Sequence, residues 1–94
     1  MIRFNDLFLN SDEKLYYIKD NPIKLTKSEY NLLTFLLNNR NKIFSREELI
    51  ENAWKEKVSE RAVDTAISRL RKKIGDYGKH LIARIGFGYG FMEN

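Results

Sequence analysis

Two short motifs of the same kind fix where helices begin in this chain. Thr26 stands three residues before Glu29, and Ser45 stands three residues before Glu48. In each pair the hydroxyl can accept a hydrogen bond from the backbone of the glutamate, while the carboxylate accepts one in return. This is the capping box that starts α-helices. The chain must therefore begin a helix at each motif and arrange its other segments around the two.

The segments behind these two starts have the apolar spacing of helices. In the first, TKSEYNLLTFLLNN, four residues fall on one helical face: Tyr30, Leu33, Leu36 and Leu37. This pattern predicts a helix with one buried side, ended by the asparagine-rich run 38–41, because asparagine tolerates the left-handed conformation. In the second, FSREELIENAWK, the capping box predicts a helix over 46–54, with Trp54 as a core or hinge residue at its end.

The two ends of the chain have the pattern of strands rather than helices. In residues 1–25, short apolar and aromatic runs are separated by asparagine, aspartate and proline, which is typical of strands joined by tight turns. The last segment, HLIARIGFGYGFMEN, alternates apolar residues with glycines and aromatics. We therefore predict a small antiparallel sheet over 1–25 and a β-hairpin over 81–92.

A third helix is predicted over 60–74, in the segment SERAVDTAISRLRKKIG, with Gly75 as its end. At about 100° per residue, four apolar residues cluster within about 60° and must face the core: Val63, Ile67, Leu70 and Ile74. The predicted order is thus a sheet over 1–25, three helices within 26–75 and a hairpin over 81–92. That order describes a single α+β domain over 1–94, a winged helix-turn-helix in which the hairpin is the wing.

The opposite face of the third helix is polar and has no carboxylate. It holds Arg61, Thr65, Ser68, Arg69 and Lys72, with Arg71 and Lys73 at its edges, and Asp64 lies to the side, where we expect it to orient a neighbouring arginine. Arginine can donate two hydrogen bonds to guanine, and the threonine methyl fits that of thymine. Small residues such as Ala66 allow close approach to base edges, and the lysines and flanking arginines suit phosphates. This face therefore predicts a reader of the DNA major groove.

Charge is distributed unevenly along the chain. Residues 1–54 hold eight basic and eight acidic side chains, whereas residues 55–94 hold nine and five, so the net charge of +4 lies entirely in the second part. Such asymmetry indicates a polyanionic partner for one face, with an ordinary solvated basic face as the simpler alternative. RNA is disfavoured as the partner, because the A-form major groove is too narrow for a helix.

Other classes of function have little support. His80 is the one histidine and has no matching ligands or nucleophile, so we expect no enzyme activity, no metal site and no cofactor. The chain has no cysteine, which excludes disulfides and fits a reducing cytoplasm. No apolar run approaches the roughly 20 residues of a membrane span, and the N-terminus lacks a signal-peptide pattern. We therefore expect a cytoplasmic location with no membrane contact.

The segments FSREELIENAW, SERAVDTAISRLRKKIG and GFGYGF, in this order and spacing, resemble the DNA-binding effector domain of OmpR/PhoB-type response regulators. The resemblance covers essentially the whole chain. It implies a bacterial transcription regulator whose third helix enters the major groove and whose wing reaches the minor groove. It also implies that Arg71 contacts a phosphate. The positions that it implies to face DNA are Arg61, Thr65, Ala66, Ser68, Arg69 and Lys72.

The resemblance further implies partners outside this chain. Regulators of this class have an N-terminal receiver domain, phosphorylated by a sensor kinase, so this chain is expected to be an excised effector domain or else a stand-alone regulator. The isolated domain is expected to be a monomer that binds double-stranded DNA at tandem half-sites. A contact with RNA polymerase is implied through the loop between the second and third helices, which is short here. The alternative function is a winged-helix module that binds protein.

The wing departs from the pattern of the family. Ile85 stands where an arginine is common, Arg84 lies one residue earlier, and Gly90 replaces a frequently basic residue. We expect wing contacts with the DNA backbone through the amides around Gly86 and Gly88 and through Arg84, which could instead pair with a carboxylate of the domain. Phe87 is expected either to pack at the wing tip or to contact the DNA sugars.

Overall fold

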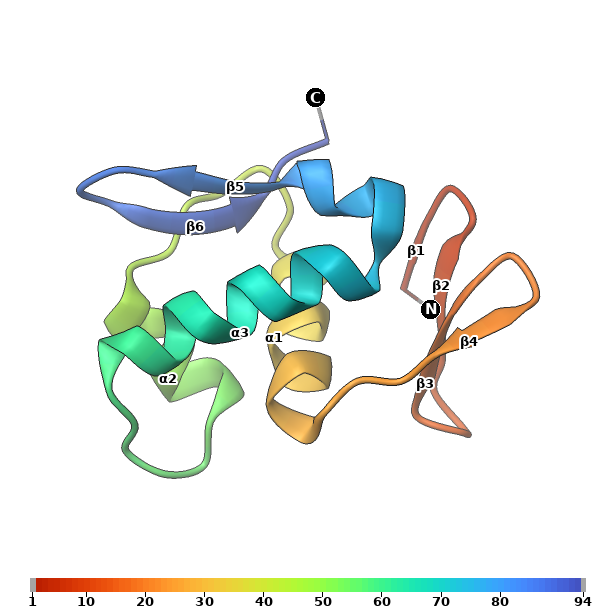
Figure 1. The fold of residues 1–94 in the computed structure, drawn as a ribbon, viewed down its shortest axis with the longest axis horizontal. Helices are drawn as coiled ribbons and strands as arrows, with labels where there is room; N and C mark the ends of the chain where they lie inside the picture. The colour runs from red at the N-terminus through yellow and green to blue at the C-terminus, as the bar shows by residue number, and fades with distance from the viewer. Residues whose placement is uncertain (1, 94) are drawn as a thin grey trace.

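The first part of the molecule is a small antiparallel sheet. The structure is a computed structural model that describes residues 2–93 (Figure 1), so Met1 and Asn94 of the predicted domain lie outside the described residues. The four strands follow one another in space in chain order: β1 (Arg3–Phe4), β2 (Leu7–Asn10), β3 (Leu15–Ile18) and β4 (Asn21–Ile23). The tight turns use left-handed residues, among them Asn5 and Lys19. The predicted N-terminal sheet is confirmed.

Three helices follow, and both predicted capping boxes are present. They are α1 (Lys27–Asn38), α2 (Arg46–Ala53) and α3 (Glu60–Lys73). The hydroxyls of Thr26 and Ser45 accept hydrogen bonds from the backbone amides of Glu29 and Glu48. The carboxylates of these glutamates accept hydrogen bonds from the backbone amides of the two capping residues. The second and third helices end one residue before their predicted limits, because Trp54 and Ile74 are the C-caps.

The helices enclose the core, and α3 packs on both α1 and α2. The four predicted core residues of this segment, Val63, Ile67, Leu70 and Ile74, are at most 1% exposed. They meet buried leucines of α1 and α2, while Trp54 is half-buried against the same cluster. Within residues 2–93, no helix combines the length and the hydrophobicity that crossing a membrane would require.

One element was not predicted, a 3₁₀ helix η1 (Gly75–His80) between α3 and the wing. Gly75 has a φ of 58° and ends α3, as expected from a glycine at this position. The chain then turns tightly because Gly78 packs against the carbonyl of Arg71, where a β-carbon would collide. The hydroxyl of Tyr77 accepts a hydrogen bond of 3.0 Å from the backbone of Asp6, which ties η1 to the sheet.

The wing is the hairpin of β5 (Leu81–Arg84) and β6 (Gly88–Phe91). Its second strand also pairs with the chain before α2, where Phe44 and Tyr89 exchange backbone hydrogen bonds of 2.9 and 3.0 Å. At Gly88 and Gly90 a β-carbon would overlap the carbonyls of Phe44 and Lys42. The wing is therefore docked along one edge, and its tip lies at the same end of the molecule as α2 and the start of α3 (Figure 1). The winged helix-turn-helix architecture is confirmed.

Candidate nucleic-acid interface

The outward side of α3 forms a continuous polar and basic face. Five exposed residues compose this surface, which we call the basic face: Arg61, Thr65, Ser68, Arg69 and Lys72. Four of them follow one another at spacings of three or four residues, which places them on one side of a helix. Within residues 2–93, none of the five side chains makes a hydrogen bond or an ion pair with the rest of the domain. Their donors are therefore free to meet an external partner.

Three other residues that were predicted to face DNA have a different environment. Ala66 is only 8% exposed and belongs to the core, because its position borders the apolar stripe of α3. Arg71 is half-buried, and its Nε donates a hydrogen bond of 2.9 Å to the carbonyl of Leu81, which ties α3 to the wing. Lys73 lies on the other flank and pairs with α1. Among the predicted residues of α3, the five of the basic face are thus those whose side chains are exposed and have no partner within residues 2–93.

The partner of Lys73 is the capping-box glutamate of α1. Lys73 Nζ lies 2.6 Å from Glu29 Oε1, which also accepts a hydrogen bond of 2.9 Å from the backbone of Thr26. Glu29 is 2% exposed, so its carboxylate is buried. Burial acts to raise the pKa of this carboxyl, but the hydrogen bonds from Lys73 and Thr26 outweigh it, so that the pKa is lowered. One ion pair thus links the start of α1 to the end of α3.

Replacing Lys73 with methionine is expected to lower the free energy of unfolding at pH 7 by about 1–2 kcal/mol, because it leaves the buried carboxylate without its cation. A lowered pKa means that the ionised Glu29 stabilises the fold at neutral pH and that this stabilisation is lost as the pH falls through that value. The difference between variant and wild type should therefore disappear in acid. Urea unfolding at neutral and at acidic pH, followed by Trp54 fluorescence, measures the free energy of unfolding of the variant and of the wild type.

The neighbouring Lys72 provides the matched control for this variant. Lys72 is exposed and has no partner within the described residues. Lys72→Met should therefore change the free energy of unfolding by less than about 0.5 kcal/mol at either pH. Equal losses for the two methionine variants would contradict the structural role of Lys73.

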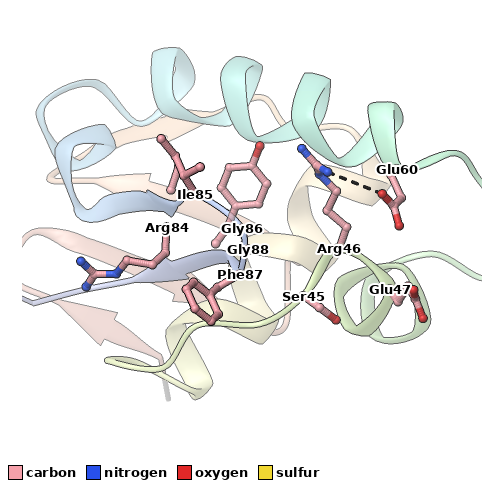
Figure 2. A pocket seen from close by; sticks show the side chains of 11 residues that line it. Ser45, Arg46, Glu47, Glu60, Arg84, Ile85, Gly86, Phe87 and Gly88 are labelled. Atoms are coloured by element: carbon pink, nitrogen blue, oxygen red, sulfur yellow. Dashed lines mark hydrogen bonds and ion pairs between the residues drawn. The ribbon is translucent and has the colours of Figure 1, made fainter.

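A second polar cluster joins the wing to α2 and α3. Arg46 Nε lies 2.9 Å from Asp64 Oδ1, and its Nη1 lies 3.5 Å from Glu60 Oε1 (Figure 2). The hydroxyl of Tyr89 donates a hydrogen bond of 2.5 Å to the same oxygen of Asp64. The bond from Tyr89 and the pairing with Arg46 lower the pKa of Asp64 despite its partial burial, so the carboxylate is held ionised.

This cluster was only partly predicted. Asp64 does orient an arginine, as expected, but the arginine comes from α2 and a tyrosine of the wing shares the carboxylate. The alternation in GFGYG could have indicated that Tyr89 faces inward, because a strand sends successive side chains to opposite faces. Nothing in the sequence indicated that it would meet α3. The cluster fixes the position of the wing relative to the basic face.

The tip of the wing is exposed. The amide of Phe87 donates a hydrogen bond of 2.9 Å to the carbonyl of Arg84, and Gly86 between them has a φ of 86°. Ile85 is 96% exposed and Phe87 is 72% exposed, so Phe87 does not pack against the domain. Arg84 is exposed and forms no ion pair within residues 2–93. An open cavity of about 350 Å³ separates the tip from the starts of α2 and α3 (Figure 2).

Comparisons with known proteins match the whole of this architecture. Residues 20–91 match the family model described as "Transcriptional regulatory protein, C terminal". The uncharacterized transcriptional regulatory protein YclJ of Bacillus subtilis is 35% identical over 98 residues, which cover 100% of this chain and 43% of the relative. The response regulator ArlR of Staphylococcus saprophyticus is 31% identical over 94 residues, with 98% and 43% covered. The chain thus spans less than half the length of these relatives.

Solved structures agree with the family match. The DNA-binding domain of the response regulator AdeR, in complex with an intercistronic region, superposes with a TM-score of 0.87 at 30% identity, over 98% of this chain and 99% of that one. The response regulator DrrB, a Thermotoga maritima OmpR/PhoB homologue, gives a TM-score of 0.83 at 36% identity, over 96% and 43%. The sheet, the three helices and the wing are thus the elements of one family's fold. The chain is a C-terminal DNA-binding domain of the OmpR/PhoB-type response regulators.

Proposed function

We propose that this domain binds double-stranded DNA sequence-specifically by placing α3 in the major groove. The basic face carries the proposal, because it is exposed, holds three cations and no carboxylate, and has no partner within residues 2–93. The major groove of B-DNA is about 12 Å wide and admits an α-helix. The solved relatives AdeR and RstA, both described as complexes with DNA, support the same reading.

The five residues of the basic face suit different parts of the duplex. Arg61 and Arg69 can donate two hydrogen bonds each to a guanine, and the methyl of Thr65 can contact that of thymine. Ser68 is small enough to let the helix approach the base edges. Lys72 is a point charge suited to a phosphate, which fixes the position of the helix without reading sequence. A surface for protein would instead expose apolar side chains here, and this face exposes none.

Binding to duplex DNA is expected to weaken steeply with salt, because each neutralised phosphate releases counterions. Fluorescence anisotropy with a pool of random duplexes should show affinity falling more than about tenfold between roughly 50 and 200 mM salt. Lys72→Met should flatten this dependence, whereas Lys24→Met, at an exposed lysine after β4, should not. A complete lack of duplex binding at low salt would replace this proposal by the protein-binding alternative.

The relatives YclJ and ArlR are more than twice as long as this chain, and ArlR is a response regulator by name. We propose that a receiver domain accompanies this domain in a cytoplasmic two-component regulator and that a sensor kinase phosphorylates the receiver domain. For RNA polymerase, we propose the largely exposed connection 55–59 between α2 and α3 as the contact.

The isolated domain is expected to be a monomer in solution. Two copies are expected to bind two tandem half-sites about one helical turn apart, which places both copies on one side of the duplex. Footprinting of a selected operator at increasing protein concentration should therefore show two protected segments with this spacing. Protection of one unrepeated half-site at saturation would contradict the tandem arrangement. Sedimentation of the DNA-free domain checks that it is monomeric.

A further inference from the structure

The wing ends in two apolar side chains that the fold does not bury. Ile85 and Phe87 are the large hydrophobic residues that are exposed within residues 2–93, at 96% and 72%. They flank Gly86 in a single three-residue turn. Two large apolar groups at the end of one hairpin are an apolar patch of the kind that marks a contact site.

The support behind the tip is rigid. The strand β6 is pressed so closely against the chain before α2 that Gly88 and Gly90 leave no room for a β-carbon. Tyr89, which lies between these glycines, bonds to Phe44 through its backbone and to Asp64 through its hydroxyl. The hairpin is thus anchored both to the segment that leads into α2 and to α3. A force applied at the tip would be transmitted to the body of the domain instead of bending the wing.

The position of the tip relative to α3 determines which part of the duplex it can meet. The tip and the start of α3 line the same cavity, through Ile85 and Glu60 among others. When α3 occupies a major groove, the next groove along the duplex surface is a minor groove. Arg84 is exposed beside the tip and supplies a positive charge for the phosphates that border it.

The tip is too wide for an undisturbed minor groove. Figure 2 shows the side chains of Ile85 and Phe87 projecting to opposite sides of the hairpin end. Two paired strands are about 4.8 Å apart before any side chain is added. The minor groove of B-DNA is about 6 Å wide, so a tip with an apolar side chain on each side fits only when the groove opens.

Resting on the proposed function, we infer that the apolar tip of the wing enters the minor groove beside α3 and holds it open. Ile85 and Phe87 contact the deoxyribose walls, and the domain thereby selects DNA whose minor groove widens at little cost. Pyrimidine–purine steps such as TA and CA are easily deformed, whereas A-tracts are stiff and narrow. Apolar side chains of other minor-groove proteins wedge between base steps and kink the duplex toward the major groove.

The inference is tested by changing the flank of a fixed binding site. Two duplexes carry the same selected core, followed on the wing side by either TA and CA steps or an A-tract. The wild-type domain should bind the flexible flank roughly fivefold more tightly or better. The double variant Ile85→Ser, Phe87→Ser should lose this preference and keep its preference for the core. Ala83→Ser, an exposed substitution in β5, is the matched control and should retain both.

A single variant is expected to reverse the preference. Ile85→Arg places a cation at the tip, and the narrow groove of an A-tract has the more negative potential. This variant should therefore shift the flank preference toward the A-tract. Fluorescence energy transfer between the ends of the duplex should show a bend with the wild type that the double serine variant reduces.

Three results would overturn the inference. They are equal wild-type affinity for both flanks, an unchanged flank preference in the double serine variant, and self-association of the DNA-free domain that the double variant abolishes. The last would make the tip a contact between copies. Failure of the inference alone leaves binding that depends on α3 intact, whereas failure of the proposed function removes duplex binding altogether, so the two are distinguishable.

Discussion

Ile67→Asp is expected to unfold the domain. Ile67 is 1% exposed in the middle of α3, where it packs with the buried residues of the other helices. A carboxylate at this position has no partner, and the cost of burying it or of breaking the core to hydrate it is several kcal/mol. A small domain has only about 5–15 kcal/mol of stability in total. Circular dichroism should therefore show lost helical signal or a strongly lowered Tm.

Its neighbour provides the matched control. Ser68 is exposed on the basic face, so Ser68→Asp should leave the fold intact and should weaken DNA binding by placing a negative charge against the duplex. The same substitution in adjacent residues thus separates a core position from an interface position. A folded Ile67→Asp variant with an unchanged Tm would contradict the assignment of this side of α3 to the core.

Arg69→Ala is expected to cause the largest loss of specific DNA binding among the folded variants. Losing one bidentate contact with a base costs about 1–3 kcal/mol, which is roughly 5- to 150-fold in affinity at the selected site. Binding to random duplex should fall much less. Competition between the selected operator and random DNA measures the ratio, and Thr65→Ala should relax a different base pair in the same assay.

Lys72→Ala should behave differently, because a phosphate contact has no sequence preference. It should weaken the selected and the random duplex by about the same factor and should reduce the salt dependence by about one unit of slope. Equal loss on both duplexes for Arg69→Ala and Lys72→Ala would contradict the division of the basic face into base-reading and phosphate-binding residues.

The elements of the fold could be predicted because their causes are local. The capping boxes at Thr26 and Ser45 fix helix starts through bonds that span three residues, and periodicity assigned Ile67 to the core and Arg69 to the surface. The 3₁₀ helix was missed because it depends on Gly78 packing against a carbonyl of α3. Periodicity does not show which residue a turn will press against.

The limits of the candidate site were set by contacts that are distant in sequence. Lys73 pairs with Glu29, 44 residues away, and Arg71 bonds to Leu81, 10 residues away. A helical projection gives the angle of each residue but not the neighbour that it will meet, so both appeared as flanking cations. The exposed apolar tip had a sequence signal in Ile85, but its meaning depended on knowing that Phe87 does not fold back.

The glycines of β6 restrict how this domain can evolve new operator preferences. Because side chains at positions 88 and 90 would displace the chain before α2, neither position can acquire a larger residue without loss of the wing's anchorage. Substitutions that change DNA recognition are therefore expected in the turn 85–87 and at the outward positions of α3. Duplicated copies of this gene should diverge first in these two stretches while they keep the glycine spacing.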